Sequence, residues 1–575
     1  MCITSYHTLS TALFCRILCI KHPWVSPQYL LWTSPKTQKH LCQPHYFQSY
    51  TNIILHHTTI PLQPVSSSSM APKTDHLHFL LIPLMSQSHI IPLTDFGKLL
   101  AQRGVVVSII TTPRNFIRYR AAIGHAACTG LQIQMIPLEF PGEEAGLPQG
   151  CENMDSLTSM DLATEFFTAC ELLEAPLLKL MAELRPRPSC VISTNALPWT
   201  QRVADGFNIP RYIFETISCF TLLCSHVLSL DRTQEMIAAA ASDPRPFLVP
   251  EIPHRIEFTK AQLPQAKTKS PDGGIETIIE QIKRARSSAR GTVVNSFEEI
   301  ESGYVEGYAK VARTLWCIGP VSACNKKPAE MLDRGNKASI DERHCMSWLD
   351  SKEAGTVIYA CFGSLCRISA AQIKEIGLGL EASGSPFVWI IRDASLTAQV
   401  LEWLNDLEEG VGERGLIIRG WAPQVLILSH PSVGGFLTHC GWNSTLEGVS
   451  AGVPMITWPM FAEQFYNEKF VVQVLRIGVR VGVEVGSGKL EDDKRAFVKW
   501  ERVKEAVEKL MGGDEEGRER RRRAREMAGR AREALEEGGS SYKNITLLIQ
   551  DVERQVTELR DGIINYLMEE TVPDC

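Results

Sequence analysis

The stretch from Trp421 to Gln464 constrains the fold of this 575-residue chain more than any other part of it. Its hydrophobic periodicity predicts a buried strand, a glycine turn, a helix and a second buried strand, at residues 433–437, 438–441, 442–451 and 453–458. A parallel strand that ends in glycine and leads into a helix presents free backbone N–H groups and about half a positive charge to a ligand. His439, Asn443 and Ser444 add side-chain donors there. The stretch therefore predicts a site for a phosphate-bearing ligand.

Strands and helices alternate from His78 onward, with the short spacing that is typical of parallel βαβ units. We therefore predict an α/β protein with two doubly wound domains and a ligand cleft between the carboxyl edges of their sheets. The predicted boundaries are 1–69 for an N-terminal extension, 70–320 for the first domain, 321–343 for a polar linker, 344–535 for the second domain, and 536–575 for a C-terminal helix and tail that packs back toward the first domain.

The extension at 1–69 differs from the rest of the chain because it contains no Asp or Glu. The absence of acids and the many Ser and Thr residues favour an organelle transit peptide. However, arginine is nearly absent and no amphipathic basic helix is visible. We therefore favour translated upstream sequence, with Met70 as the working start, and expect the segment to be disordered.

Composition excludes several function classes. The net charge of −6 gives no general basic field for nucleic acid, and no run of about 18 apolar residues predicts a membrane span. Seventeen cysteines without metal-site spacing are typical of reduced core cysteines, so we expect a cytoplasmic protein, and we expect a monomer. The basic run Arg520–Arg523 allows a nucleic-acid patch, but Glu and Arg interleave at helical spacing around it, which favours a solvated surface helix. A nicotinamide-dependent oxidoreductase is disfavoured because GxGxxG follows the first strand of neither domain.

The 421–464 stretch resembles the signature of the plant family 1 UDP-glycosyltransferases along its whole length. The resemblance rests on Trp421-Ala-Pro-Gln424, His439-Cys-Gly-Trp-Asn-Ser444, Glu447-Gly448 and Glu463-Gln464, and weaker similarity extends over about residues 76–550. It implies a GT-B fold, in which two Rossmann-like domains face each other across a cleft, with the acceptor bound by the first domain and the UDP-sugar by the second. It also implies an inverting transfer of glucose from UDP-glucose, which forms a β-glucoside on a flavonoid, phenol, terpenoid or steroid.

The resemblance assigns the nucleotide contacts to three residues. Trp421 is expected to stack on uracil, Gln424 to lie close to the nucleotide, and Glu447 to accept from the ribose hydroxyls. Two of these residues have a structural interpretation as well. Trp421 also suits a buried core position, and Ser444-Thr-Leu-Glu447 also fits a helix capping box.

The resemblance also assigns the diphosphate and sugar contacts. The residues expected at the diphosphate are Ser364, His439, Asn443 and Ser444, and those expected at the sugar are Glu463, Gln464, Trp442 and, on weaker grounds, Thr216. A closing Gln resembles the glucose-using members, whereas galactose users tend to carry His. No Asp-x-Asp stands in the donor site, so we expect no metal and no cofactor besides the donor substrate, with the helix dipole and these donors stabilising the leaving group.

His89 is the candidate general base. It follows the predicted strand at 79–84 and precedes the helix predicted at 91–103, where the family carries its catalytic histidine. An imidazole of near-neutral pKa suits proton abstraction from an acceptor hydroxyl. The structural alternative is a histidine that caps this helix.

The chain departs from the family pattern at two positions near this base. Ser88 stands where the family has Gly, and Thr194 stands where the family has the Asp that orients the catalytic histidine. A hydroxyl can orient an imidazole but cannot stabilise imidazolium, and Asn195 would offer an uncharged acceptor. Three consequences stay open: low activity, an acceptor acidic enough to need little base, or a catalytically weak or inactive UDP-sugar-binding homologue.

Overall fold

Seven parallel strands form the sheet of the N-terminal domain. The computed structural model describes residues 77–239, 245–264, 274–392, 395–486 and 497–570. The strand order is β3-β2-β1-β4-β5-β8-β9, so the winding reverses between β1 and β4. The bounds are β1 (His78–Ile82), β2 (Val106–Thr111), β3 (Ile133–Pro137), β4 (Cys190–Thr194), β5 (Arg211–Glu215), β8 (Gly291–Val294) and β9 (Leu315–Cys317). Short apolar runs buried on both faces are typical of such parallel strands.

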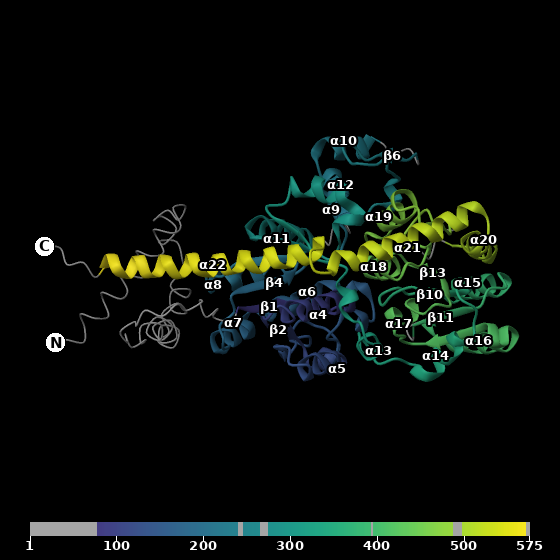
Figure 1. Cartoon of the computed structure of the whole chain (residues 1–575), viewed down its shortest axis with the longest axis horizontal. Helices are drawn as coiled ribbons and strands as arrows, with labels where there is room; N and C mark the ends of the chain where they lie inside the picture. Colours follow the sequence, from purple (N-terminus) through teal and green to yellow (C-terminus); the bar gives the residue numbers. More distant parts are fainter. Residues whose placement is uncertain (1–76, 240–244, 265–273, 393–394, 487–496, 571–575) are drawn as a thin grey trace. The chain divides into compact units, whose positions relative to one another are not determined.

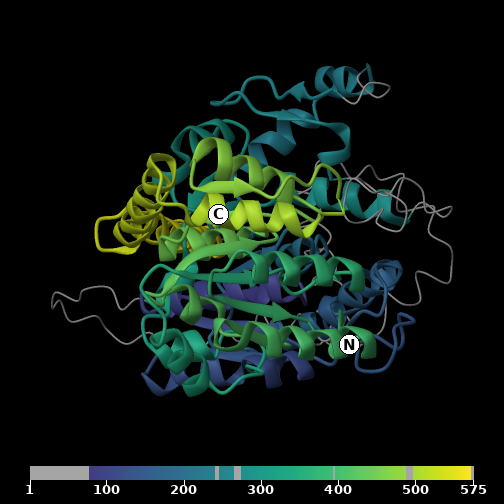
Figure 2. The same cartoon turned by 90° about the vertical axis from the view of Figure 1, so that its right-hand side faces the viewer.

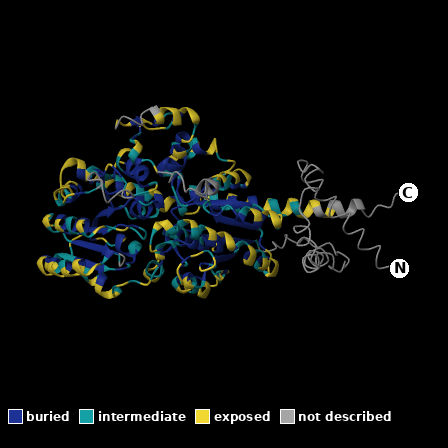
Figure 3. Ribbon diagram, turned by 180° about the vertical axis from the view of Figure 1, so that it is seen from behind, coloured by how far each residue is buried: buried dark blue, intermediate teal, exposed yellow. Residues whose placement is uncertain are grey.

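Helices cover this sheet because each strand needs apolar cover on both faces. In Figure 3 the strands are dark blue, for buried, while the outer faces of the helices are yellow. The helices are α4 (Gln87–Ala101), α5 (Pro113–Cys128), α6 (Ala163–Leu172), α7 (Glu174–Glu183), α8 (Thr200–Gly206), α9 (Cys219–Leu228), α10 (Asp231–Ala239), α11 (Gly274–Ser288) and α12 (Glu298–Ala309). A small antiparallel pair, β6 (Phe247–Leu248) and β7 (Glu257–Phe258), lies apart from the sheet.

Six parallel strands form the sheet of the C-terminal domain, in the order β12-β11-β10-β13-β14-β15. The bounds are β10 (Val357–Cys361), β11 (Phe387–Ile391), β12 (Gly415–Arg419), β13 (Val433–Thr438), β14 (Met455–Thr457) and β15 (Gly478–Arg480). Figure 2 shows this sheet in green with helices on both sides. The helices are α14 (Glu342–Asp350), α15 (Ala370–Ala382), α16 (Ala398–Val411), α17 (Gln424–Leu428), α18 (Trp442–Ala451), α19 (Gln464–Lys469), α20 (Trp500–Met511) and α21 (Glu515–Leu535). The prediction of two doubly wound domains is confirmed, and the second winding reverses between β10 and β13.

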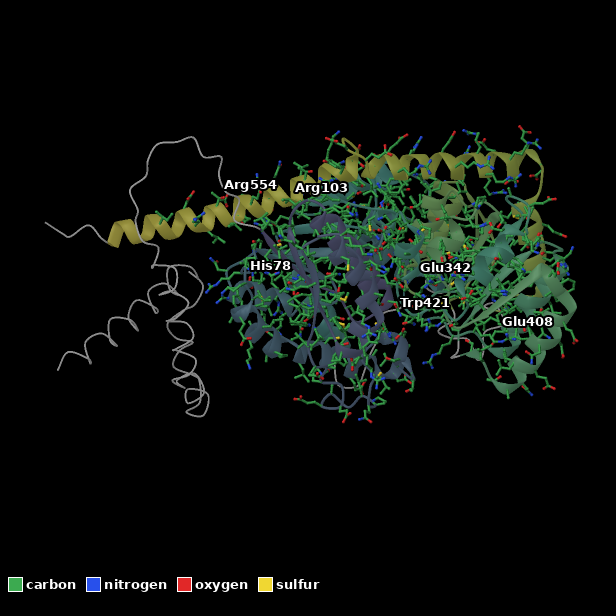
Figure 4. All side chains as sticks on the ribbon, turned by 60° about the horizontal axis from the view of Figure 1, so that its bottom comes forward. His78, Arg103, Glu342, Glu408, Trp421 and Arg554 are labelled. Atoms are coloured by element: carbon green, nitrogen blue, oxygen red, sulfur yellow. The ribbon has the colours of Figure 1, made fainter. Side chains whose placement is uncertain are left out.

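The last helix, α22 (Ser540–Glu570), runs along the N-terminal domain (Figure 1). Its Ile545, Leu548 and Val552 are buried in the core of that domain. Asp551 accepts from the Tyr212 hydroxyl at 2.7 Å and pairs with Arg290 at 2.9 Å. Figure 4 labels Arg554, which belongs to this helix, and Arg103, which stacks on Tyr542 of α22 with 3.5 Å between guanidinium carbon and ring centre. The C-terminal helix therefore ties the domain that follows the linker back to the one that precedes it.

Three predicted elements differ from those observed. The helix predicted at 91–103 begins at Gln87, four residues earlier, because Ser86 takes the extended N-cap conformation. The sequence also predicts helix over 171–184 with a restart at Pro176, and the division between α6 and α7 is found two residues earlier, where α7 begins at Glu174. After the signature stretch the sequence pattern predicts a helix over 464–477, but α19 ends at Lys469 and the chain continues as a short π-helix, Phe470–Val474. The first difference matters for function because it places His89 inside the first turn of α4.

The polar linker is more ordered than its composition predicts. It contains a 3₁₀ turn at Val321–Cys324 and a short helix, α13 (Pro328–Leu332). Residues 77–570 belong to one compact unit, Thr74–Cys575, whereas the predicted extension at 1–69 lies outside the described residues. None of the helices in the described part of the chain combines the length and the apolar character needed to cross a membrane.

Candidate active site

A cavity of about 560 Å³ lies where the carboxyl ends of the two sheets meet. Its first-domain lining comes from the segments after β1, β4 and β5, and its second-domain lining from those after β10, β12, β13 and β14. Among these strands, β1 and β4 flank the point where the winding of the first sheet reverses, and β10 and β13 flank that of the second. Ligands of doubly wound sheets bind at such points. Every residue that the sequence assigned to the site lines this cavity except Thr194.

His89 reaches the cavity from the first turn of α4. The residue is partly exposed, and its Nδ1 atom is buried without a hydrogen-bond partner among the described residues. Burial lowers the pKa of His89 to about 4. With Nδ1 enclosed, Nε2 is the nitrogen left to meet an acceptor. The ring is therefore neutral at pH 7, and nothing beside it in the described chain stabilises a positive charge.

Thr194 does not orient His89. This residue ends β4, beside β1, and its Oγ1 accepts a hydrogen bond from the Leu84 backbone N–H at 2.9 Å. Asn195 lines the cavity, but its side chain does not bond Nδ1 of His89 either. The Thr194 hydroxyl therefore bonds the backbone after β1 and not His89. His89 has neither the carboxylate that orients the histidine in the family nor an uncharged acceptor in its place.

A cross-domain contact holds the turn that carries His89. Pro92 lies inside α4 and has no N–H, so it cannot donate to the carbonyl of Ser88 four residues earlier. Asn443 of α18 donates to that carbonyl instead, with 2.7 Å between Nδ2 and the oxygen. One N–H of Asn443, which the sequence assigned to the diphosphate, is therefore engaged with the first domain.

His439 is enclosed by two glycines. A methyl group at Gly363, which follows β10, or at Gly441, which precedes α18, would come within 2.4 Å of the Nε2 atom of His439. Burial lowers the pKa of His439 to about 4, although a contact with the Cys361 backbone acts in the opposite direction. The ring therefore offers a neutral hydrogen bond beside the N-terminus of α18, and its position depends on the absence of side chains at both neighbours.

We expect Gly363→Ala to weaken UDP-glucose binding by about 10-fold to 100-fold, because a displaced His439 would lose a hydrogen bond worth about 1–3 kcal/mol. The matched control is Gly384→Ala. Both glycines have a left-handed φ, +76° and +71°, but nothing lies within 4 Å of a methyl group at Gly384. Titration calorimetry with UDP-glucose measures both variants. Equal affinities would show that His439 does not contact the donor.

Glu447 sits in a buried polar network on α18. Its Oε2 accepts from Gln424 Nε2 at 2.8 Å, and the same nitrogen is 2.9 Å from Ser444 Oγ. The capping-box interpretation is wrong, because α18 begins at Trp442 with Gly441 as its N-cap, which places Ser444 inside the helix. The carboxylate therefore does not cap the helix, and its ribose contact stays a prediction.

Arg334 is the residue that sequence reasoning missed. It comes from the linker, its side chain is only 8% exposed, and it donates at 2.8 Å to both Asp95 of α4 and Glu447 of α18. Burial lowers the pKa of Arg334, but the two carboxylates raise it by more, so its pKa lies above the ordinary value for arginine. No motif indicated this residue, since an isolated arginine in a polar segment resembles any solvated one. It connects the helix that carries His89 to the helix that carries Glu447.

The two tryptophans of the signature stretch have different environments. Trp421 is partly exposed and lines the cavity, and Figure 4 shows its label where the blue N-terminal and green C-terminal ribbons meet. Trp442 is 2% exposed, and its Nε1 donates to the Asn295 carbonyl of the first domain at 2.8 Å. Trp442 is therefore a core residue, whereas Trp421 borders the cavity, where its ring can contact a flat ligand ring.

The sugar-side residues lie at the start of α19. Gln464 is buried, and its Oε1 accepts from the backbone N–H groups of Met460 and Phe461 at 2.8 and 3.1 Å. These donors fix the orientation of the amide and leave its Nε2 for the cavity. Burial raises the pKa of Glu463, and backbone N–H groups lower it, including that of Trp442.

The remaining lining divides into a polar and an apolar part. Ser364 follows Gly363 at the end of β10, and Thr216 follows β5, so both hydroxyls lie at cavity-facing strand ends. Apolar side chains of the first domain line the acceptor side: Met154, Met160, Phe167, Ile217 and Ile282. Arg367, from the second domain, holds the loop before Met160 by donating to the carbonyls of Leu157 and Thr158, each at 2.5 Å. Among the described residues, no group of three or more His, Cys, Asp or Glu is arranged to hold a metal ion.

Known proteins with the same sequence pattern and fold are glycosyltransferases. A family model described as UDP-glucoronosyl and UDP-glucosyl transferase matches residues 337–510. UDP-glycosyltransferase 73C3 of Arabidopsis thaliana is 50% identical over 480 residues, which is 83% of this chain and 96% of that protein. UDP-glycosyltransferase 1 of Barbarea vulgaris is 49% identical over 490 residues, or 84% and 98% of the two chains. The crystal structure of Glycyrrhiza uralensis UGT73P12 with glycyrrhetinic acid 3-O-monoglucuronide superposes with a TM-score of 0.78 at 33% identity, covering 86% of this chain and all of that one.

Proposed function

This chain belongs to the plant family 1 UDP-glycosyltransferases, and from that premise we propose that it is an inverting glucosyltransferase, which uses UDP-glucose to form a β-glucoside on a small lipophilic metabolite. The observation that carries the proposal is the convergence of both sheets on one cavity. His89 comes from the switch point of the first sheet, and the predicted UDP-sugar contacts come mainly from the carboxyl ends of the second, after β10, β12, β13 and β14. A base and a donor site that face each other suit direct transfer between two bound substrates.

The donor side of the cavity suits a nucleotide sugar. Trp421 offers a ring face for uracil, and Glu447, held by Gln424, offers carboxylate oxygens to ribose hydroxyls. His439, Ser444 and the N-terminal N–H groups of α18 offer donors to the diphosphate. Each group that binds the diphosphate also stabilises the charge that develops on it as it leaves.

The choice of glucose rests on Glu463 and Gln464. The amide of Gln464 is oriented by two backbone donors, so its Nε2 meets a sugar hydroxyl in a fixed direction. A buried amide that is left without a partner is costly, which makes such a contact selective between epimers. UDP-glucose is therefore the proposed donor.

The reaction balances as a single displacement. The acceptor oxygen gives up its proton, either to Nε2 of His89 or to water before it binds, and forms a bond to the anomeric carbon. The bond from that carbon to the diphosphate oxygen breaks, and UDP leaves with the electron pair. Attack opposite the leaving group inverts the α-linkage of UDP-glucose to a β-glucoside.

The apolar side of the cavity supports a lipophilic acceptor. Two thioethers and an aromatic ring, from Met154, Met160 and Phe167, favour contact with flat or fused-ring carbon skeletons. The relative from Glycyrrhiza uralensis was crystallised with glycyrrhetinic acid 3-O-monoglucuronide, which is consistent with a large hydrophobic acceptor. Flavonoids, simple phenols, terpenoids and steroids are the candidate classes.

One observation favours a second candidate function. Nδ1 of His89 has no partner in the described chain, although a catalytic base needs one. A protein that binds UDP-sugar without catalysing transfer would not need such a partner. The two functions differ in acceptor-dependent chemistry, not in donor affinity.

The test is UDP release by the full chain with UDP-glucose and a panel of phenolic and terpenoid acceptors. We expect acceptor-dependent release above the acceptor-free background, slower turnover with UDP-galactose, and a β-linked anomeric proton in the product by NMR. Binding of UDP-glucose without release from any acceptor would favour the UDP-sugar-binding alternative.

A further inference from the structure

The environment of His89 carries an inference about the acceptor, and this inference rests on the proposed transferase function. The Nδ1 atom is buried and unpartnered in the described chain. The hydroxyl of Thr194, which occupies the orienting position, already accepts from the Leu84 N–H. A general base of this kind normally needs a partner at Nδ1 for two reasons, and here neither need is met.

The first need is for the correct tautomer. Nε2 can accept a proton only if the neutral ring carries its hydrogen on Nδ1. Nothing in the described chain accepts from an N–H at the buried Nδ1, so no contact holds the neutral ring of His89 in that tautomer, and the opposite tautomer, in which Nε2 is already protonated, is the one that avoids an orphaned buried N–H. The enclosed Nδ1 therefore keeps most of the population in a form that cannot act as a base.

The second need is for charge stabilisation after proton transfer. Burial lowers the pKa of His89 to about 4, and that cost is not offset by a neighbouring anion. Three carboxylates line the cavity in the described chain, and each is engaged elsewhere. Glu215 pairs with Arg286 and Glu447 with Arg334, while Glu463 is held by backbone N–H groups. Ser88, which precedes His89, and Asn195, which follows Thr194, also line the cavity, and both side chains are uncharged.

We infer that this site glucosylates hydroxyl groups that are already acidic in water, namely phenols and carboxylic acids, and discriminates against aliphatic alcohols. An acidic acceptor reaches the cavity as its anion, with its proton already given to water. The remaining step forms the bond from the acceptor oxygen to the anomeric carbon and releases UDP with the electron pair of the broken bond. His89 then needs only to donate a hydrogen bond from Nε2 to the anionic oxygen, which its favoured tautomer allows.

The lining of the acceptor side fits an aromatic acceptor. Phe167 and the thioethers of Met154 and Met160 give polarisable contacts to a ring face. Because these residues lie on the same side of the cavity as His89, an aromatic ring held among them presents a ring hydroxyl to Nε2. Ring-bound hydroxyls are acidic by about six orders of magnitude relative to water itself, with a pKa of about 10.

The experiment is an acceptor series measured with the full chain and UDP-glucose at one pH. The acceptors are para-substituted phenols of graded acidity and aliphatic alcohols of matched size, such as cyclohexanol. We expect kcat/KM to rise as the phenol becomes more acidic, down to the assay pH, and to be at least about 100-fold lower for the alcohols. For each phenol, kcat/KM should rise with pH until the pH reaches the pKa of that phenol.

Two variants test whether the missing carboxylate is the reason for slow transfer to alcohols. Thr194→Asp supplies the charge, and Thr194→Asn supplies the same shape without it. We expect Thr194→Asp to raise kcat/KM for the alcohols by about 10² to 10⁴ and to flatten the dependence on phenol acidity, whereas Thr194→Asn should not. Melting curves check that both variants fold, and the wild-type series decides the matter if they do not.

Three results would overturn the inference in distinguishable ways. Equal kcat/KM for phenols and matched alcohols would reject it and leave the transferase function intact. A wild-type pH profile that ignores the acceptor pKa would do the same. Binding of UDP-glucose without transfer to any acceptor would reject the proposed function itself.

Discussion

Replacing His89 by alanine is expected to lower kcat for glucose transfer to a weakly acidic phenol by about 10² to 10⁴, the usual worth of a general base or a comparably placed proton donor. His89 is the only histidine that lines the first-domain side of the cavity in the described chain. The donor contacts come from the other sheet, so the affinity for UDP-glucose should change little. Rates of UDP release and titration of UDP-glucose into the same protein measure the two effects separately. The loss should shrink as the phenol becomes more acidic, because an ionised acceptor needs no base.

The matched control is His125→Ala. His125 also belongs to the first domain, but it is half-exposed on α5 and pairs with Asp333 of the linker, away from the cavity lining. Its removal should leave kcat within a factor of about two, as for most surface changes. Unchanged turnover in His89→Ala would reject the role of this residue, and a parallel loss of UDP-glucose affinity would indicate a collapsed cavity instead.

Replacing Arg334 by methionine is expected to reduce the free energy of unfolding by about 3–5 kcal/mol, because it leaves Glu447 as a buried anion without its cation and leaves Asp95 with Lys98 as its remaining cation, at 3.5 Å. The three side chains are 8%, 2% and 8% exposed, and Arg334 is 2.8 Å from each carboxylate. Glu447 would also lose one of the two groups that orient it, so UDP-glucose affinity should fall about tenfold. Denaturant unfolding and titration calorimetry measure the two losses.

An exposed arginine that also pairs with two carboxylates provides the control. Arg202 also bridges two carboxylates, Glu171 at 2.8 Å and Glu174 at 2.5 Å, but its side chain is 50% exposed. Arg202→Met should cost less than about 1 kcal/mol, since water solvates what the arginine leaves. Similar losses of unfolding free energy in the two variants would show that Arg334 is not a buried connection between Asp95 and Glu447. Arg334→Lys should restore part of the loss, because lysine keeps the charge but cannot donate in a fork to two carboxylates.

The signature stretch was predicted well from sequence because its signals are local. The strand–turn–helix at 433–451 follows from apolar runs and from glycines, and α18 spans Trp442–Ala451 with Gly452 in the left-handed conformation at its end. The start of α4 was predicted four residues late. Proline is common in the first turn of a helix, so Pro92 favours a late start. In the structure Pro92 lies within α4, and Asn443 donates to the Ser88 carbonyl, to which Pro92 cannot donate.

The sequence by itself determined the two doubly wound domains and the residues that their strand ends present, because these follow from periodicity and from motifs within a few residues. Only the tertiary structure decided what each of these side chains has beside it. The Thr194 hydroxyl accepts from the Leu84 N–H and does not reach Nδ1 of His89, and Arg334 of the linker pairs with Asp95 and Glu447. Such pairings join residues more than 100 positions apart, or across two domains, and they depend on which buried polar groups the fold brings together. No local pattern encodes that, since a buried charge takes whichever partner lies within hydrogen-bond reach.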